Sequence, residues 1–137
     1  MQALADALVA FGLGLGALAA AAALYGRYRT LPAFLTGPAV CTLDAANGCH
    51  VLFRTRFAAL LGVPNAALGL AGYAAILCGL VLGWPTRLLL AASAAALAMT
   101  VYLAYVLLRD KLQCRICWAG HLANLSLFLG LLLKLTT

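Results

Sequence analysis

Four uncharged, apolar stretches constrain this chain more than any other feature of its sequence. They cover residues 7–26, 57–86, 88–108 and 116–133, and each is about long enough to cross a bilayer once. Of the 137 residues, 66% are hydrophobic, while nine are Lys or Arg and three are Asp or Glu. A water-soluble domain of this size exposes too large a fraction of its surface to hide so much apolar area. The sequence therefore predicts an all-α integral membrane protein.

Basic residues and turn-forming residues between the stretches place the expected helices. The first stretch lacks the basic cluster of a signal peptide and exceeds the length of a signal core, so we expect it to remain as a helix. No internal repeat or interdomain linker divides the chain, which indicates a single membrane domain over residues 1–137. The expected transmembrane helices of this four-helix bundle cover about 4–25, 63–83, 88–108 and 114–133.

One substantial loop, residues 26–56, separates the first two helices. Proline, glycine and asparagine punctuate it, as is typical of turns. Its end overlaps residues 49–61, CHVLFRTRFAALL, in which apolar side chains are interrupted by Arg54 and Arg56. This pattern predicts a short lateral amphipathic helix that lies at the membrane interface between helices 1 and 2.

Four of the five cysteines are expected at one face of the membrane. An even number of crossings puts both termini on one side and the long loop, with the turn before the last helix, on the other. Cys41, Cys49, Cys114 and Cys117 are then neighbours, although they are far apart in sequence. The fifth, Cys78, lies within an apolar run and is predicted to be a small packing residue.

The pair Cys114 and Cys117 forms a Cys-x-x-Cys motif at the start of the last helix. Unpaired N–H groups and the helix dipole stabilise a thiolate there. Cys117 is almost one turn deeper than Cys114, toward the hydrocarbon. Cys41 and Cys49, eight residues apart in the loop, can close a disulfide and can exchange with Cys114. The pattern favours electron transfer from a polar donor to an apolar acceptor by successive thiol–disulfide exchange.

Other functions fit parts of this pattern. The four cysteines can instead form two structural disulfides or a four-sulfur zinc site in a metal-binding or metal-transporting protein. We assign no metal ligand, because the spacing of Cys41 and Cys49 is looser than in zinc knuckles and no further metal-like cluster is present. We expect no nucleic-acid binding, because the cations lie in short turns beside apolar spans, where they meet lipid headgroups or set topology.

The order of these motifs resembles that of the vitamin K epoxide reductase family. The segment AVCTLDAANGCHVLFRTRFAALLG is similar to the family's loop and lateral helix, and NAALGLAGY, TVYLAYVL and CRICWAGHLANLSLF to parts of its helices 2, 3 and 4. Many bacterial and archaeal members are thiol oxidases that drive disulfide formation. The resemblance implies a membrane quinone as electron acceptor, with a menaquinone-type naphthoquinone favoured over ubiquinone. It also implies a thioredoxin-like redox protein as electron donor.

The resemblance gives each of the four cysteines a role. Cys41 would exchange with the partner protein, and Cys49 would carry electrons inward to Cys114. Cys117 would be the thiolate next to the quinone. No thioredoxin-like domain is fused within these residues, so we expect the donor to be a separate protein. Recycling of a quinone or of vitamin K epoxide, with the same wiring, is the alternative, although nothing in the sequence indicates an epoxide substrate.

Three polar residues match positions around the family's quinone. Asn65 matches an asparagine whose amide donates to a quinone carbonyl, and Thr55 matches a hydroxyl position near the redox centre. His121 follows Cys117 by four residues on the same helix face, where vertebrate members have a tyrosine as the second carbonyl partner. This histidine can donate a hydrogen bond or deliver a proton. In the alternative interpretation it is a structural residue, satisfied by the backbone or by Asn124, itself a candidate helix-packing residue.

The distribution of Lys and Arg predicts the orientation in the membrane. Short cytoplasmic loops carry an excess of these residues, so the cysteine face is predicted to be cytoplasmic, inverted relative to most of the family, with an extracytoplasmic face as the alternative. Inverted members occur in hyperthermophilic archaea, where cytosolic disulfides are an exception to the usual rule. The cysteine side holds Arg27, Arg29, Arg54, Arg56, Arg109, Lys111 and Arg115, against Arg87 and Lys134 on the other side.

Overall fold

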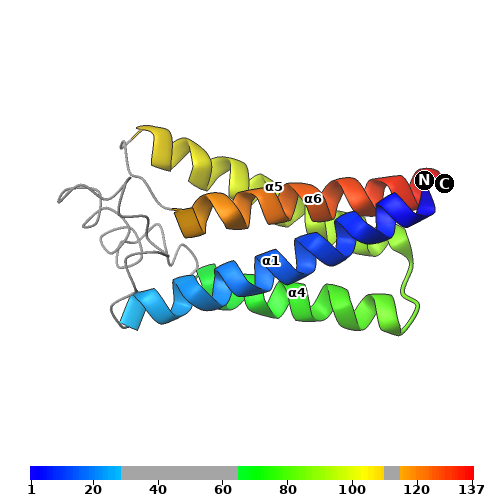
Figure 1. Cartoon of the computed structure of the whole chain (residues 1–137), viewed down its shortest axis with the longest axis horizontal. Helices are drawn as coiled ribbons and strands as arrows, with labels where there is room; N and C mark the ends of the chain where they lie inside the picture. The colour runs from blue at the N-terminus through cyan, green and yellow to red at the C-terminus, as the bar shows by residue number, and fades with distance from the viewer. Residues whose placement is uncertain (29–64, 110–114) are drawn as a thin grey trace.

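The described part of the chain is an up-and-down bundle of four helices (Figure 1). The computed structural model of the chain describes residues 1–28, 65–109 and 115–137. Over these residues it contains helices and short turns and no strand, which confirms the predicted all-α fold. The helices are α1 (Gln2–Tyr28), α4 (Asn65–Val81), α5 (Thr86–Arg109) and α6 (Arg115–Thr136).

Three of these helices, α1, α5 and α6, are long and apolar enough to cross a membrane. The fourth, α4, has 17 residues, all uncharged, and rises about 25 Å along its axis. It lies alongside the others over most of their length (Figure 1). The structure thus supports the predicted helical membrane bundle, and the chain is a multi-pass membrane protein.

The observed helix ends differ from the predicted ones by one to three residues. Helix α1 continues to Tyr28, where the loop was predicted to begin at residue 26, and α6 continues to Thr136 rather than ending at residue 133. Helix α5 begins at Thr86 rather than at residue 88. The physical reason is that a charge ends an apolar stretch without ending a helix, since long basic side chains reach the polar interface from a continuing helix. The predicted first residues of the second and fourth helices, 63–64 and 114, lie outside the described residues.

The α4–α5 turn is fixed by the backbone. Gly83 has φ of 72°, a left-handed conformation that glycine adopts without steric cost. The N–H of Trp84 donates to the carbonyl of Gly79 (2.8 Å), and the N–H of Gly83 donates to that of Leu80 (3.3 Å). This pair of bonds is the Schellman arrangement that closes a helix C-terminus. Helix α5 begins directly after this turn, where the N–H groups of Leu88 and Leu89 donate to the Pro85 carbonyl.

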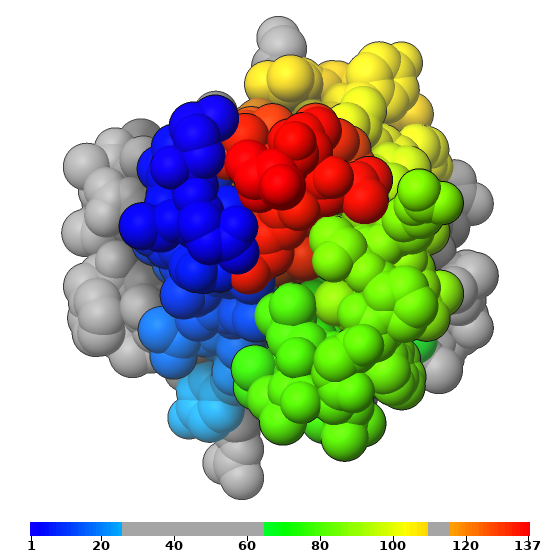
Figure 2. Space-filling model, turned by 90° about the vertical axis from the view of Figure 1, so that its right-hand side faces the viewer, coloured from blue at the N-terminus to red at the C-terminus, as the bar shows by residue number. Residues whose placement is uncertain are grey.

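The two ends of the bundle differ in what they hold. Both chain termini and the α4–α5 turn lie at one end, here called the terminal end (Figures 1 and 2). Tyr28, Asn65, Arg109 and Arg115, the helix residues that flank the undescribed segments, lie at the opposite end, here called the loop end (Figure 1). This arrangement agrees with the even number of crossings expected from the sequence.

Helices α1 and α6 form the closest pair in the bundle. A Cβ on Gly12 would lie 2.7 Å from the backbone nitrogen of Leu127, and one on Gly130 would lie 2.9 Å from that of Val9. Small residues of this kind allow two helix backbones to approach inside a membrane. The Ser126 hydroxyl donates to the Leu8 carbonyl across the same contact (3.0 Å).

Candidate functional site

A cavity of about 550 Å³ lies among the four helices, within the size range of small-molecule sites. Its walls are mostly alanine, glycine and leucine, so it suits an apolar ligand. The cavity exists because α4 and α5 make few contacts with each other and because the α1 wall carries small side chains such as Ala19, Ala20 and Ala23. A few polar or redox-active side chains also line it: Asn65, Tyr73, Thr100, Cys117, His121 and Asn124.

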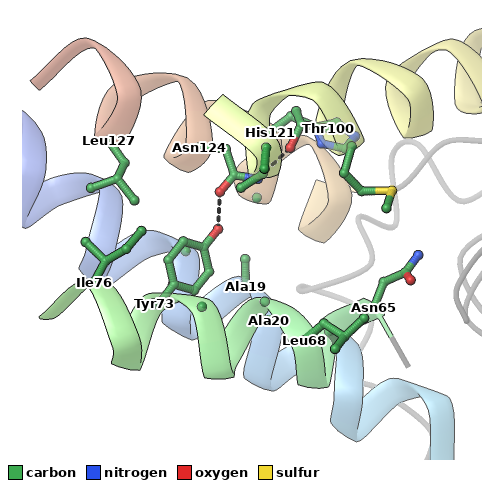
Figure 3. A pocket seen from close by; sticks show the side chains of 18 of the residues that line it. Ala19, Ala20, Asn65, Leu68, Tyr73, Ile76, Thr100, His121, Asn124 and Leu127 are labelled. Carbon is green, nitrogen blue, oxygen red and sulfur yellow. Dashed lines mark hydrogen bonds between the residues drawn. The ribbon is translucent and has the colours of Figure 1, made fainter. Parts of the chain in front are cut away.

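Three of the predicted site residues line this one cavity. Cys117 lies in the first turn of α6, is half-buried, and packs against the cluster of Ala19, Leu107 and Ile116. His121 follows one turn later on the same helix. Asn65 is the first residue of α4 and reaches the cavity from the other side of the bundle (Figure 3). The structure therefore brings α4 and α6 residues together around one volume, as expected, while their roles stay predictions.

The remaining predicted site residues cannot be placed in this way. Cys41, Cys49, Cys114 and Thr55 lie outside the described residues, as do most of the loop 26–56 and the lateral helix predicted at 49–61. The electron relay and the hydroxyl near it therefore stay predictions.

His121 has an unusual environment for a half-buried histidine. Its Nε2 is buried and has no hydrogen-bond partner among the described residues. Its ring meets Trp118 edge to face, with the ring centroids 5.4 Å apart. A buried polar atom without a partner is costly, so such atoms often mark a place where a ligand supplies the missing bond. A ligand oxygen in the cavity would do so here.

A hydrogen-bonded group next to His121 was not predicted as part of the site. The Tyr73 hydroxyl donates to Asn124 Oδ1 (2.5 Å), and Asn124 Nδ2 donates to Thr100 Oγ1 (2.5 Å; Figure 3). Asn124 is thus the helix-packing residue that the sequence allowed, and in the described structure it does not satisfy Nε2 of His121. The signal for Tyr73 and Thr100 was present, because isolated polar residues in apolar spans usually face the protein interior.

Cys78 does not occupy the position expected for it. The sequence predicted a small packing residue, but the side chain is exposed on α4, so this prediction is wrong. Helix α4 is apolar around its whole circumference, and its pattern therefore did not show which side faces the bundle.

Metal binding is not decided by the described residues. Among them no three His, Cys, Asp or Glu side chains lie close enough together to hold a metal ion. The four-cysteine alternative depends on Cys41, Cys49 and Cys114, which lie outside this part of the chain.

Comparison with known proteins gives one clear result. No curated protein and no solved structure matches the chain. By contrast, residues 7–131 match the family model described as the Vitamin K epoxide reductase family. The match runs through all four described helices and covers most of the 137 residues. The chain therefore belongs to the vitamin K epoxide reductase family and is a multi-pass membrane oxidoreductase of the quinone-linked thiol or epoxide reductase kind.

Proposed function

We propose that this protein is a thiol oxidase that passes electrons from a thioredoxin-like protein to a membrane quinone. The electrons travel through Cys41 and Cys49 to Cys114 and Cys117, and the product is oxidised partner protein, which promotes disulfide formation. One observation carries the proposal: Cys117, His121 and Asn65 line a single apolar cavity inside a membrane bundle. Family membership supports it independently.

The position of Cys117 suits the last step of this relay. It lies within the apolar wall of the cavity, in the first turn of α6, where a quinone dissolved in lipid can reach it. Oxidation of the Cys114–Cys117 dithiol to a disulfide releases two electrons and two protons. A quinone takes up these two electrons and two protons to become a quinol, so the reaction balances without another reactant.

The cavity fits a naphthoquinone ring. Such a ring carries two carbonyl oxygens on opposite edges, and each gains from a hydrogen-bond donor when it leaves water. The Asn65 amide and the His121 imidazole come from α4 and α6, on different sides of the cavity, and each can donate one bond. These donors also stabilise the negative charge that develops on the oxygens during reduction. A menaquinone-type ring is the favoured substrate, with ubiquinone as the alternative.

The test is quinone absorbance over time with the purified chain and a thiol donor. We expect naphthoquinone reduction that disappears in Cys117→Ala with any donor. In Cys41→Ala it should disappear with a protein donor and persist with a small thiol, because a small thiol can reach the inner cysteines directly. Absence of turnover with every quinone, in folded protein with intact thiols, would refute the proposal and favour the metal-binding alternative.

The family match also accommodates reduction of vitamin K epoxide with the same cysteines. The same assay with the epoxide as substrate separates the two functions. Reduction of the epoxide at a rate comparable with quinone reduction would favour cofactor recycling.

We further propose that the cysteine face is cytoplasmic, from the excess of Lys and Arg at that end of the helices. Labelling of reduced Cys41 in intact cells with a membrane-impermeant thiol reagent tests this orientation. We expect labelling only after the membrane is opened, and ready labelling of intact cells would show that the face is extracytoplasmic.

A further inference from the structure

The polar side chains in the middle of the cavity tie three helices together at one level. Tyr73 of α4 bonds to Asn124 of α6, which bonds to Thr100 of α5. No water is available in a bilayer interior to replace these bonds, and an unpaired polar group there is costly. The bonded arrangement is therefore strongly favoured over an open one.

The fourth helix takes part through a glycine. A Cβ on Gly16 of α1 would lie only 2.7 Å from the Tyr73 hydroxyl oxygen and equally close to an edge atom of its ring. The absence of a side chain at Gly16 thus makes room for the tyrosine. The α1 backbone in turn prevents the ring from moving away from the cavity. Gly16, Tyr73, Thr100 and Asn124 all line the cavity, and we call them the Tyr73 belt.

The belt separates two parts of the cavity with different chemistry. Asn65, Cys117 and His121 lie on the loop-end side of the belt. Figure 3 shows Asn65 there. Ile76 and Leu127 lie on the terminal-end side (Figure 3), where the cavity reaches Trp84 beside the α4–α5 turn. The Tyr73 hydroxyl proton is committed to Asn124 and is therefore not offered to a ligand.

We propose that the Tyr73 belt is a depth stop that holds the ring of a bound quinone in the loop-end part of the cavity, beside Cys117. The inference rests on the proposed function, because it takes the quinone as the electron acceptor. A ring that passed the belt would place its carbonyl oxygens among apolar side chains, where they lose their hydrogen bonds. It would also move away from the thiol that reduces it. Tyr73 is therefore a positioning residue that determines how deep the ring binds.

The two tryptophans of the chain are natural reporters of ring depth. Trp118 packs against His121 on the loop-end side of the belt, and Trp84 lines the terminal-end part of the cavity. A quinone quenches the fluorescence of a tryptophan that it approaches closely. The variants Trp84→Phe and Trp118→Phe each leave one reporter in the full chain. With 2-methyl-1,4-naphthoquinone as probe, we expect strong quenching of Trp118 and little quenching of Trp84.

Removal of the stop should redistribute the probe. In Tyr73→Ala we expect Trp84 to gain quenching and Trp118 to lose it. Tyr73→Phe keeps the ring and loses the hydroxyl bond to Asn124, so the belt is weakened by one net hydrogen bond. We expect kcat and KM for the quinone to fall together by up to about fivefold, because a ring bound beyond the belt is bound unproductively. Tyr102→Phe is the matched control, because Tyr102 is an exposed tyrosine of α5, and it should leave both measurements unchanged.

Each outcome decides the proposal. Strong quenching of Trp84 with the belt intact, no quenching of either tryptophan, or unchanged quenching in Tyr73→Ala would overturn it. A rise in KM at constant kcat in Tyr73→Phe would also count against it, since unproductive binding beyond the belt lowers both constants together. Quenching of Trp118 without any quinone turnover would refute the proposed oxidase function and still support the depth stop.

Discussion

The two ends of the bundle divide stability and function between them. At the terminal end, α1 and α6 meet backbone to backbone at Gly12 and Gly130, and large residues such as Leu127 and Leu131 are fully buried. At the loop end the buried cluster is small, and alanines widen a cavity that continues past the Tyr73 belt as far as Trp84. The comparison teaches that a membrane bundle can hold an internal site without loss of its fold when close packing is concentrated in one helix pair, here α1 and α6. Substitutions at the two ends should therefore affect different measurements.

The largest difference between the effect on activity and the effect on stability is expected at Cys117. Cys117→Ser replaces the thiol by a hydroxyl of similar size, so the packing of the loop end is kept while the nucleophile and electron carrier is lost. We expect quinone reduction to fall roughly a thousandfold or more, with an unchanged unfolding temperature in detergent. An unfolding temperature lowered as far as that of a terminal-end variant would contradict the proposed division.

The opposite behaviour is expected at Gly130. An added Cβ would lie 2.9 Å from the Val9 nitrogen and 3.0 Å from the Ala5 carbonyl oxygen, and backbone atoms cannot move aside as a flexible side chain can. We expect Gly130→Ala to destabilise the bundle by roughly 1–3 kcal/mol, as overpacking does, with KM for the quinone unchanged. The measurement is thermal unfolding followed by circular dichroism.

Gly14→Ala is the matched control for this variant. Gly14 lies on the same helix as Gly12, and a Cβ there meets nothing within 4 Å. Its unfolding temperature should stay the same or rise slightly, since alanine favours a helix over glycine. Equal destabilisation by both variants would show that close packing of α1 and α6 is not the cause.

Substitution of His121 should affect stability and quinone binding in opposite directions. His121→Leu removes a buried Nε2 that has no partner in the described structure, so we expect the bundle to gain about 1 kcal/mol in stability. The same change removes a donor to the quinone, and we expect KM to rise about tenfold. His121→Tyr should retain most of the affinity, because a tyrosine hydroxyl can also donate. A stability loss in His121→Leu would show that the imidazole has a structural role instead.

The fold was predictable from the sequence because lipid leaves few choices. A span without charges must be a helix whose backbone is satisfied internally, and an even number of spans fixes which ends lie together. The incorrect predictions concern helix ends and helix faces, which the need to satisfy the backbone in lipid does not determine. Charges marked the ends of apolar stretches and not the ends of helices, so α1 was predicted to end before Tyr28. Apolar residues surround α4 on all sides, so its pattern gave no sign that Cys78 is exposed.

The site was predictable only in part, for a similar reason. Asn65, Cys117 and His121 were found through a family resemblance, and the cavity that joins them depends on how far α4 and α5 stay apart. The Tyr73–Asn124 hydrogen bond joins residues 51 positions apart, and no local sequence pattern predicts such a pair. Polar residues in apolar spans were the available signal, and a search for them would have found Tyr73 and Thr100.

The smallest effect is expected at Cys78. Its substitution tests whether a cysteine outside the cavity contributes to turnover or stability. This thiol is exposed on α4, and Cys78 does not line the cavity that holds Cys117. Cys78→Ala should therefore leave quinone turnover and the unfolding temperature unchanged, since surface substitutions away from special features have effects within about 0.5 kcal/mol. Turnover assays on the variant, with both small-thiol and protein donors, make the measurement. A marked loss of turnover would place a fifth cysteine in the relay and would mean that electrons do not enter the bundle from the loop end alone.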